Sequence, residues 1–569
     1  MSTKGKAAPA KKKPAKAVKA AGAAKPARVA KSARAYPDLH DHLETLKKRG
    51  LLKVIDRPSD KDSELHPLVR WQFVGGMAEH ERKAFLFTNI VDGLGRKYDI
   101  PVVVGALAAN RAIYSAGMGA PVEKIQARWD KAIANPVKPR VVKNAACQEV
   151  VHMGADLKGK MKGLDRLPIP ISTPGFDSTP TLTATNVITK DPDSGVQNMG
   201  TYRCALKASD RLVVRMATRV GGAGGYIHYQ KHQQRGDKTM PCAIVLGCPP
   251  YVAFMGPQKL PIGVDEFDVA GGLAGAPINM VRAKTVDLMV PAEAEVVIEG
   301  LIDTEWLEPE APFGESHGHV ALEEFNMPMK VTAITHRKAP VIPSYISQVA
   351  PSESSVIKRV AYEPLFLAHL RDALGIRGVK RVSLHEPLTG LLRVTVITVA
   401  KGTPTTEIWR ALYGAAYFKG DCGKICIAVN EDIDPDNADA LFWAMAYRMN
   451  PVEDVQALAH RGQGHGPKRE ADDDEDSTLL MDATMKSEMP PLALPKREFM
   501  ERAKVIWEEM GMPPLRPQPP WFGYSLGDWM PQWDEAAARA VAGKYLENGR
   551  ISLGQQKKGI KPETKFRPE

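Results

Sequence analysis

Short β-branched runs separated by turns dominate the chain between Leu182 and Ser344. They are five to eight residues long: LTATNVIT, RLVVRMA, PCAIVLG, VDLMV, AEVVIEG and MKVTAIT. Many short strands with turn signals between them favour a barrel or split barrel. Two amphipathic segments, near Tyr226–Gln234 and Val264–Leu273, interrupt the strands. This stretch therefore constrains the fold more than any other part of the sequence.

The flanking regions have a different pattern. Residues 37 to about 150 begin with an amphipathic helix and continue with strand-like runs such as KAFLFTNI and IPVVVGAL. After about residue 350 helical and strand-like segments alternate, which predicts a mostly parallel sheet covered by helices. We therefore expect a mixed α/β (α+β) protein. The expected parts are a disordered basic tail (1–35), an N-terminal α/β domain (36–155), a split β-barrel (156–348), a C-terminal α/β domain (349–490) and a wrapping extension (491–569).

The net charge of +11 is confined to one segment. Residues 1–36 contain nine lysines, two arginines and no acid, and the rest of the chain has 66 basic and 66 acidic residues. An Ala/Lys/Pro segment without apolar periodicity is expected to be disordered. Such a tail could contact nucleic acid through phosphates, solubilise the protein or serve as a transit peptide. The neutral remainder gives no support for a nucleic-acid partner, and we favour a simple solubilising tail.

Composition also bears on compartment. No apolar run approaches the roughly 20 residues of a membrane span, and no secretory signal is recognisable at the N-terminus. The six cysteines are scattered, without a CxxC pair. This pattern is typical of reduced thiols, so a cytoplasmic protein with no membrane partner is predicted.

Three polar clusters lie within the β-rich region. QNMGTYR offers Asn198 and Arg203, LPIGVDEFD offers Glu266 between two aspartates, and EAPFGESHGH offers Glu310 and Glu315. Five residues is a poor same-face spacing on a helix, and in a strand the two glutamates would point to opposite faces. Only a folded-back loop at the Pro-Phe-Gly turn brings both carboxyls into one pocket. An arginine beside them would grip a carboxylate close to a proton donor.

Taken singly, each cluster has a simpler interpretation as a surface ion pair or a helix cap. Taken together, five separated blocks resemble the UbiD-type decarboxylase family. These blocks, in chain order, are NMGTYR, GVDEFDVAGGLAGAPINMVRAKTVDLMVPAEAEVVIEG, EAPFGESHGH, NEDIDPDNADALFWAMAYR and LLMDATMK. The resemblance covers roughly Tyr36 to Lys486.

The resemblance implies a cofactor and a reaction. It implies reversible, non-oxidative decarboxylation of an aromatic or α,β-unsaturated acid on prenylated FMN bound in the central domain. The cofactor phosphate would be held through a divalent metal (Mn²⁺ or Mg²⁺, with Fe²⁺ as a further option) and K⁺. A flavin prenyltransferase would supply the cofactor, and the enzyme would be a homo-oligomer, a dimer or a hexamer.

The same resemblance places the expected site residues. The catalytic group would be Arg203, Glu310 and Glu315. Arg203 would orient the carboxylate and keep Glu310 ionised, and Glu315 would deliver the proton that replaces carbon dioxide. The implied cofactor-binding residues are Thr183, Asn198, Thr201, Arg203 and, by a loose alignment, Lys419. The implied metal ligands are Asn198 and Glu266.

One position departs from the family pattern. The family has a metal-binding His where this sequence reads VGGAGGYIHYQKH, so that His is replaced by Gly224 or a neighbour. Either His228 substitutes for it, or water and phosphate complete the metal shell. His228 could equally be an ordinary helix-surface residue. The histidines at 317 and 319 could form a metal pair, but lining the pocket is the favoured interpretation.

Two alternatives stay open. One is a decarboxylase acting on an aroyl-CoA thioester such as phthaloyl-CoA, and the other is a catalytically impaired family member that serves as an assembly subunit. The substrate itself cannot be derived from the spacing of residues.

Overall fold

A computed structural model describes residues 34–216, 224–258, 260, 264–310, 312–316, 318–321, 324–386, 392–418, 423–462, 475–487, 489–490, 492–515, 532–558 and 561. The chain divides into two units, and Tyr36–Glu569 is the second. The five-part domain division remains a prediction. Among the described residues, no helix is long and apolar enough to cross a membrane. Of the six cysteines, the five described ones are buried and form no disulfide.

The second unit begins with helix α1 (Leu39–Lys48). Asp38 caps the helix by accepting a hydrogen bond from the backbone N–H of Asp41, and the side chains of Leu39, Leu43 and Leu46 are buried. A cap that satisfies an otherwise unpaired N–H, with leucines at helical spacing, explains why the helix starts here and which face it buries. The helix packs into the apolar core that also lines the central sheet.

A four-stranded sheet follows, and its last strand comes from far along the chain. Its order is β1 (Leu52–Ile55), β3 (Ala84–Phe87), β6 (Val102–Val104) and β22 (Ile342–Ser344). β22 pairs with β6 in parallel, with Ile342 opposite Val102. The helices of this region are α2 (Leu65–Val74), α3 (Arg111–Met118) and α4 (Ile125–Ala134).

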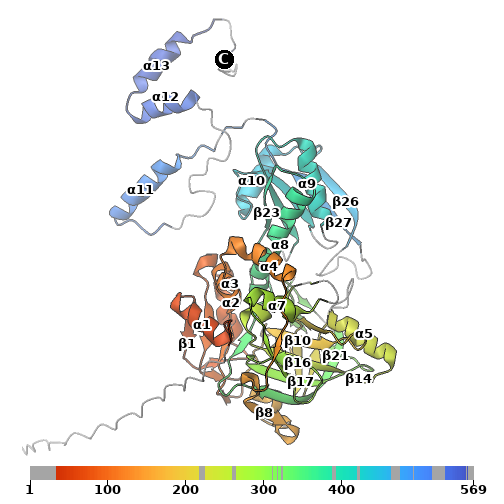
Figure 1. Ribbon diagram of the computed structural model, residues 1–569. Helices are drawn as coiled ribbons and strands as arrows, with labels where there is room; N and C mark the ends of the chain where they lie inside the picture. Colours follow the sequence, from red (N-terminus) through yellow and green to blue (C-terminus); the bar gives the residue numbers. More distant parts are fainter. Residues whose placement is uncertain are drawn as a thin grey trace, which may run out of the picture. The chain divides into compact units, whose positions relative to one another are not determined.

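The central sheet has ten strands and is antiparallel throughout (Figure 1). Eight follow one path: β11 (Gln197–Gly200), β10 (Thr185–Lys190), β14 (Thr239–Leu246), β17 (Val296–Asp303), β21 (Glu324–His336), β13 (Arg211–Val214), β12 (Cys204–Ala208) and β9 (Thr181–Leu182). Two more, β18 (Glu308–Glu310) and β8 (Val150–Met153), also pair with β21. No pairing among described residues joins β11 to β9, so the split barrel stays a prediction.

The amphipathic segments between these strands are helices α5 (Gly224–Arg235) and α7 (Glu266–Ala274). The run VDLMV does not join the central sheet. It leads into β16 (Met289–Pro291), which forms a small sheet with β15 (Asn279–Arg282) and β7 (Arg140–Val141).

The C-terminal sheet has the order β23 (Val379–Leu384), β24 (Val394–Val399), β25 (Ile425–Asn430), β27 (Glu475–Asp482) and β26 (Val455–Gly462). Its three central strands are parallel and both edge strands are antiparallel. The helices here are α8 (Glu353–Ala368), α9 (Thr405–Tyr417) and α10 (Ala438–Arg448). Helices α11 (Arg497–Glu509), α12 (Gln532–Val541) and α13 (Tyr545–Gly554) follow. The expected mixed α/β class is thus confirmed.

A histidine pair joins β8 to β21. His152 Nε2 lies 3.1 Å from His336 Nε2 and accepts a hydrogen bond from Arg166 Nη1 at 3.0 Å. Burial and the nearby Arg166 charge lower the pKa of His152, and burial also lowers the pKa of His336. A second proton on either ring would make that ring positive, and the positive charge of Arg166 would repel it.

This pair should make folding stability depend on pH. Because the folded pKa values lie below the ordinary 6.5, the unfolded chain takes up protons first, and stability falls as pH drops below about 6.5. The free energy of unfolding in urea, measured at pH 7 and pH 5, should fall less in His152→Gln than in the wild type. His80→Gln, at an exposed position, is the control. An unchanged difference in His152→Gln would contradict the expectation.

Candidate active site

Arg203 contacts two carboxylates, one at the end of a strand and one in the hairpin that follows it. It directly precedes β12, and its guanidinium binds Glu310 through two parallel hydrogen bonds, Nε to Oε1 and Nη2 to Oε2, both 2.7 Å. Its Nη1 donates to Glu315. A two-pronged arginine–carboxylate contact fixes distance and orientation together. The three residues that the sequence singled out are therefore brought into one cluster.

The loop between the two glutamates is folded back as the sequence predicted. Glu310 ends β18, and Glu315 follows β19 (Phe313–Gly314), which pairs with β20 (Val320–Ala321). The backbone N–H of Glu315 donates to the carbonyl of His319 at 2.9 Å. Gly318 has φ of 93° and donates to the carbonyl of Glu315 at 3.0 Å. A positive φ favours glycine, so this residue allows the tight turn that aims Glu315.

The cluster is largely shielded from water. Two arginines, Arg203 and Arg215, lie close to the Glu315 carboxylate. The side chains of Arg203, Glu310 and Glu315 are 10%, 2% and 15% exposed. Burial alone would raise the pKa of Glu315, but the charges of Arg203 and Arg215, with hydrogen bonds from Arg203 and the Ser316 N–H, outweigh it and lower that pKa to about 2. Glu315 is therefore ionised at neutral pH in this state and carries no proton to donate.

Sequence reasoning missed three supporting residues. Arg215 Nη2 lies 3.7 Å from Glu315, Asn326 donates to Glu310 Oε2 at 3.2 Å, and the Arg203 guanidinium stacks 4.7 Å from the Phe313 ring centre. Pairing of β12 with β13 places Arg215 beside Arg203, as the hydrogen bond from the Arg215 N–H to the Arg203 carbonyl shows. The sequence offered one signal for Arg215: it lies four residues after Arg211 in the predicted strand RLVVRMA, so both arginines are expected on the same face.

Asn198 and Glu266 form a second polar group. Glu266 opens α7 and accepts the backbone N–H of Met199 at 3.1 Å. The first residue of α5 lies directly against Asn198, because a Cβ on Gly224 would fall 2.0 Å from Asn198 Oδ1. Only glycine fits at that approach. The start of α5, the Asn198 amide and the Glu266 carboxyl are thus held close together.

The environment of Glu266 suits a cation. Its carboxyl is buried, no ion pair reaches it from the described residues, and burial raises its pKa to about 7. A metal ion would supply the missing positive charge, and amide and carboxylate oxygens are suitable ligands for Mg²⁺ or Mn²⁺.

His228 remains an open candidate. Its Nδ1 lies 2.9 Å from Thr189 Oγ1, and burial lowers its pKa to about 4, so the ring is neutral, as metal binding requires. In the described part of the chain, however, no three His, Cys, Asp or Glu side chains come together as a metal-binding group.

The two remaining predicted cofactor residues that the structure describes, Thr183 and Thr201, are hydrogen-bonded to other parts of the chain. Thr183 Oγ1 lies 3.0 Å from Ser344 Oγ and accepts the Tyr345 N–H at 2.9 Å. Thr201 donates its N–H to the Gly256 carbonyl at 3.2 Å. Lys419 and His317 lie outside the described residues.

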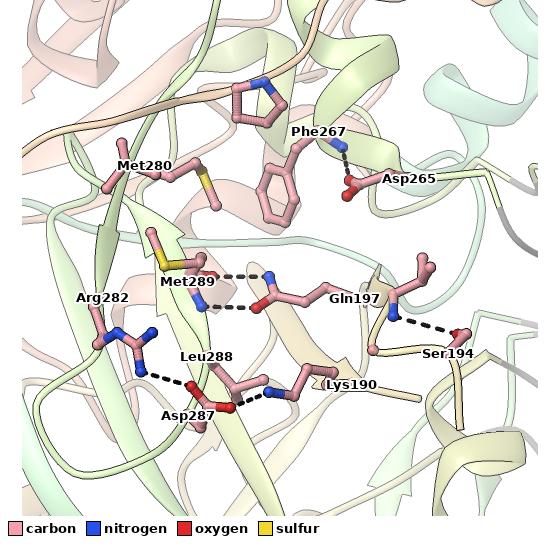
Figure 2. A pocket seen from close by; sticks show the side chains of 14 residues that line it. Lys190, Ser194, Gln197, Asp265, Phe267, Met280, Arg282, Asp287, Leu288 and Met289 are labelled. Carbon is pink, nitrogen blue, oxygen red and sulfur yellow. Dashed lines mark hydrogen bonds and ion pairs between the residues drawn. The ribbon is translucent and has the colours of Figure 1, made fainter. Parts of the chain in front are cut away.

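A cavity of about 530 Å³ lies beside the second group and not at the arginine (Figure 2). Gln197, which precedes Asn198, lines it together with Asp265 and Phe267, which flank Glu266. The Gln197 amide is tied to the Met289 backbone at 3.0 and 2.7 Å. Neither Arg203 nor the two glutamates line this cavity. The candidate active site is therefore the cluster of Arg203, Glu310 and Glu315, which lies apart from this cavity.

Comparison with known proteins identifies the family. Residues 140–349 match the UbiD model described as the 3-octaprenyl-4-hydroxybenzoate carboxy-lyase Rift-related domain, and residues 356–483 match its C-terminal domain. Together the two matches cover more than half of the chain. The chain belongs to the UbiD family. The expected enzyme class, a carboxy-lyase (decarboxylase), is confirmed, and both polar groups lie within the first match.

Solved structures of UbiD-class enzymes share the fold. HmfF from Pelotomaculum thermopropionicum, in complex with FMN, is 29% identical with a TM-score of 0.69, covering 81% of this chain and 96% of that one. An evolved dimeric HmfF in complex with prFMN is 28% identical with a TM-score of 0.67, covering 80% and 97%. The vanillic acid decarboxylase of Sedimentibacter hydroxybenzoicus, 24% identical with a TM-score of 0.66 and covering 84% and 100%, supports the fold alone.

The arginine cluster can be tested by a double-mutant cycle. Arg203→Met leaves Glu310 buried without a cation, and breaking a buried pair from one side costs about 3–5 kcal/mol. The free energy of unfolding at pH 7 should fall by about that amount. Arg203→Met combined with Glu310→Gln should recover part of the loss, because no buried charge then remains at residue 310. A double variant no more stable than Arg203→Met would rule out this coupling.

Proposed function

We propose that this UbiD-family protein catalyses the reversible, non-oxidative decarboxylation of an aromatic or α,β-unsaturated carboxylic acid with prenylated FMN. The observation that carries the proposal is the convergence of Arg203, Glu310 and Glu315 in one buried cluster. Complexes of HmfF with FMN and prFMN support the choice of cofactor. When bound, the modified flavin supplies an electron sink that no side chain provides.

Arg203 would bind the carboxylate that is lost as carbon dioxide. Its guanidinium already contacts two glutamates, so a substrate carboxylate adds a third negative charge to the cluster. Glu310 is held by two hydrogen bonds from Arg203 and one from Asn326, whereas Glu315 receives one from Arg203, one from the N–H of its neighbour Ser316 and a longer ion pair with Arg215. We therefore expect the substrate carboxylate to displace Glu315 from Arg203 and to leave Glu310 in place.

Displacement of Glu315 would also prepare it to act as an acid. Away from Arg203, burial is the dominant influence on its carboxyl, and burial raises a carboxyl pKa. Glu315 would then take up a proton when substrate binds and deliver it to the carbon that loses carbon dioxide. In this proposal the low pKa of Glu315 in the substrate-free enzyme keeps its carboxyl ionised, and Glu315 becomes a proton donor only after the substrate has bound.

Asn198, Glu266 and the start of α5 would hold the cofactor phosphate. Glu266 and Asn198 offer oxygen ligands to a divalent metal, Mn²⁺, Mg²⁺ or Fe²⁺, with K⁺ as a second cation, and His228 is the candidate nitrogen ligand. Backbone N–H groups at the start of a helix favour phosphate. Thr183, Thr201 and Lys419 are proposed as further cofactor contacts.

The same proposal includes the partners that the sequence implied. The enzyme would receive its cofactor from a flavin prenyltransferase and assemble as a homo-oligomer, a dimer or a hexamer. An aroyl-CoA thioester remains the alternative substrate class. A catalytically impaired assembly subunit is disfavoured, because Arg203 and both glutamates are present and in contact.

Substrate binding should be accompanied by proton uptake. Calorimetric titration of a substrate acid at pH 7, in buffers of different ionisation enthalpy, should report about one proton gained per site. The reason is that Glu315 changes from a pKa of about 2 to a protonated state. Glu315→Gln should bind without this uptake. Equal heats in all buffers for the wild type would remove Glu315 from the acid role.

Two isosteric variants should separate chemistry from cofactor binding. Glu315→Gln removes the transferable proton, so turnover by enzyme co-expressed with a flavin prenyltransferase should fall by roughly a hundredfold or more, while flavin and metal content stay near wild type. Glu266→Gln should lose metal and, with it, flavin. Absorbance spectra and metal analysis give the readout. The opposite pattern would invert the two assignments.

A further inference from the structure

Gln348 is a buried polar residue beside the hairpin that carries Glu315. Its residue is 6% exposed, and its Cγ lies where a Cβ on Gly314 would be only 2.8 Å away. Gly314 directly precedes Glu315. The Gln348 side chain therefore packs against the backbone that positions the proposed acid.

Two N–H groups fix the carbonyl end of the Gln348 side-chain amide. Its Oε1 accepts the Ser347 N–H at 3.2 Å and lies 3.5 Å from Arg70 Nη2. Rotating the amide would turn Nε2 toward two groups that can only donate, so the orientation is determined. Nε2 has no hydrogen-bond partner in the described part of the chain.

Gln72, the other buried glutamine among the described residues, is satisfied at both ends. Gln72 donates from Nε2 to the Lys83 carbonyl and accepts the Lys83 N–H at Oε1, both at 2.8 Å. Because buried polar groups in folded proteins nearly always find partners, the unpaired Nε2 of Gln348 needs a reason. A ligand oxygen would supply the missing acceptor.

The charge behind Gln348 favours an electron-rich oxygen as the acceptor. Arg70 donates to the carbonyls of Val349 at 2.7 Å and Pro351 at 3.1 Å, and no carboxylate pairs with it among the described residues. Burial lowers its pKa to about 10, which still leaves it charged at neutral pH. Ser172 Oγ, buried on the loop before Thr173, is likewise unpaired, and Thr173 also borders Gly314.

We propose that Gln348 Nε2 donates a hydrogen bond to an oxygen that the substrate carries in addition to the carboxylate it loses. This inference rests on the proposed decarboxylation and narrows its substrate class to acids with a second carboxylate or a phenolic oxygen. Gln348 is then a specificity-determining residue, because a plain acid would leave its donor unpaired.

Gln348→Glu is the sharpest variant. It keeps an acceptor for Ser347 and adds a charge opposite Arg70, but it replaces the unpaired amide donor by an acceptor. Its melting temperature should equal or exceed that of the wild type. Gln72→Glu is the matched control and should melt lower, because it loses its bond to the Lys83 carbonyl. Gln348→Leu, which also lacks the donor, serves if the first variant does not fold.

Binding to flavin-loaded enzyme is measured by calorimetry with benzoate, 4-hydroxybenzoate and benzene-1,4-dicarboxylate. The wild type should bind one or both of the oxygen-bearing acids at least about tenfold more tightly than benzoate. Both Gln348 variants should lose that preference while retaining flavin. If the wild type shows the preference but decarboxylates none of the acids, the reaction proposed above fails and the role of Gln348 stands.

Three results would overturn the inference. Equal binding of all three acids, or of none, by the wild type would remove the second oxygen from recognition. A melting temperature of Gln348→Glu as low as that of Gln72→Glu would show that Nε2 has a protein partner. Loss of flavin from the Gln348 variants would assign the donor to the cofactor instead of the substrate.

Discussion

The structure around the site depends on one buried arginine. Arg203 draws together Glu310 at the end of β18 and Glu315 on the next hairpin, more than a hundred residues further along the chain. Two carboxylates this deeply buried would repel each other without it. The guanidinium therefore determines how β12, β18 and the hairpin meet, and it does so by charge and geometry together.

Part of this arrangement could be predicted from the sequence. The rigid turn at Pro312–Gly314 excludes a helix, and five-residue spacing excludes a shared strand face, so only a folded-back loop brings Glu310 and Glu315 together. The alternation of strands and helices likewise gave the fold class. These inferences depend on local geometry, which short segments of sequence encode directly.

Other features depend on pairing between distant segments. Asn326 reaches Glu310 because β21 pairs with β18, and Gln348 meets Gly314 because two loops far apart in sequence pack together. The low pKa of Glu315 also follows from contacts with Arg203 and Arg215, which no spacing reveals. Lys419 and the Gly-rich segment before Gly224 lie outside the described residues, so their predicted contacts remain predictions.

Strand β22 has a consequence for how the chain folds during synthesis. It completes the N-terminal sheet by pairing with β6, yet Ile342 is made some 240 residues after Val102, as their numbering shows. Until the ribosome has passed residue 344, β6 presents an unpaired edge of three valines. Exposed apolar edges recruit other strands, so the nascent chain is most vulnerable to aggregation while the central sheet is still being translated.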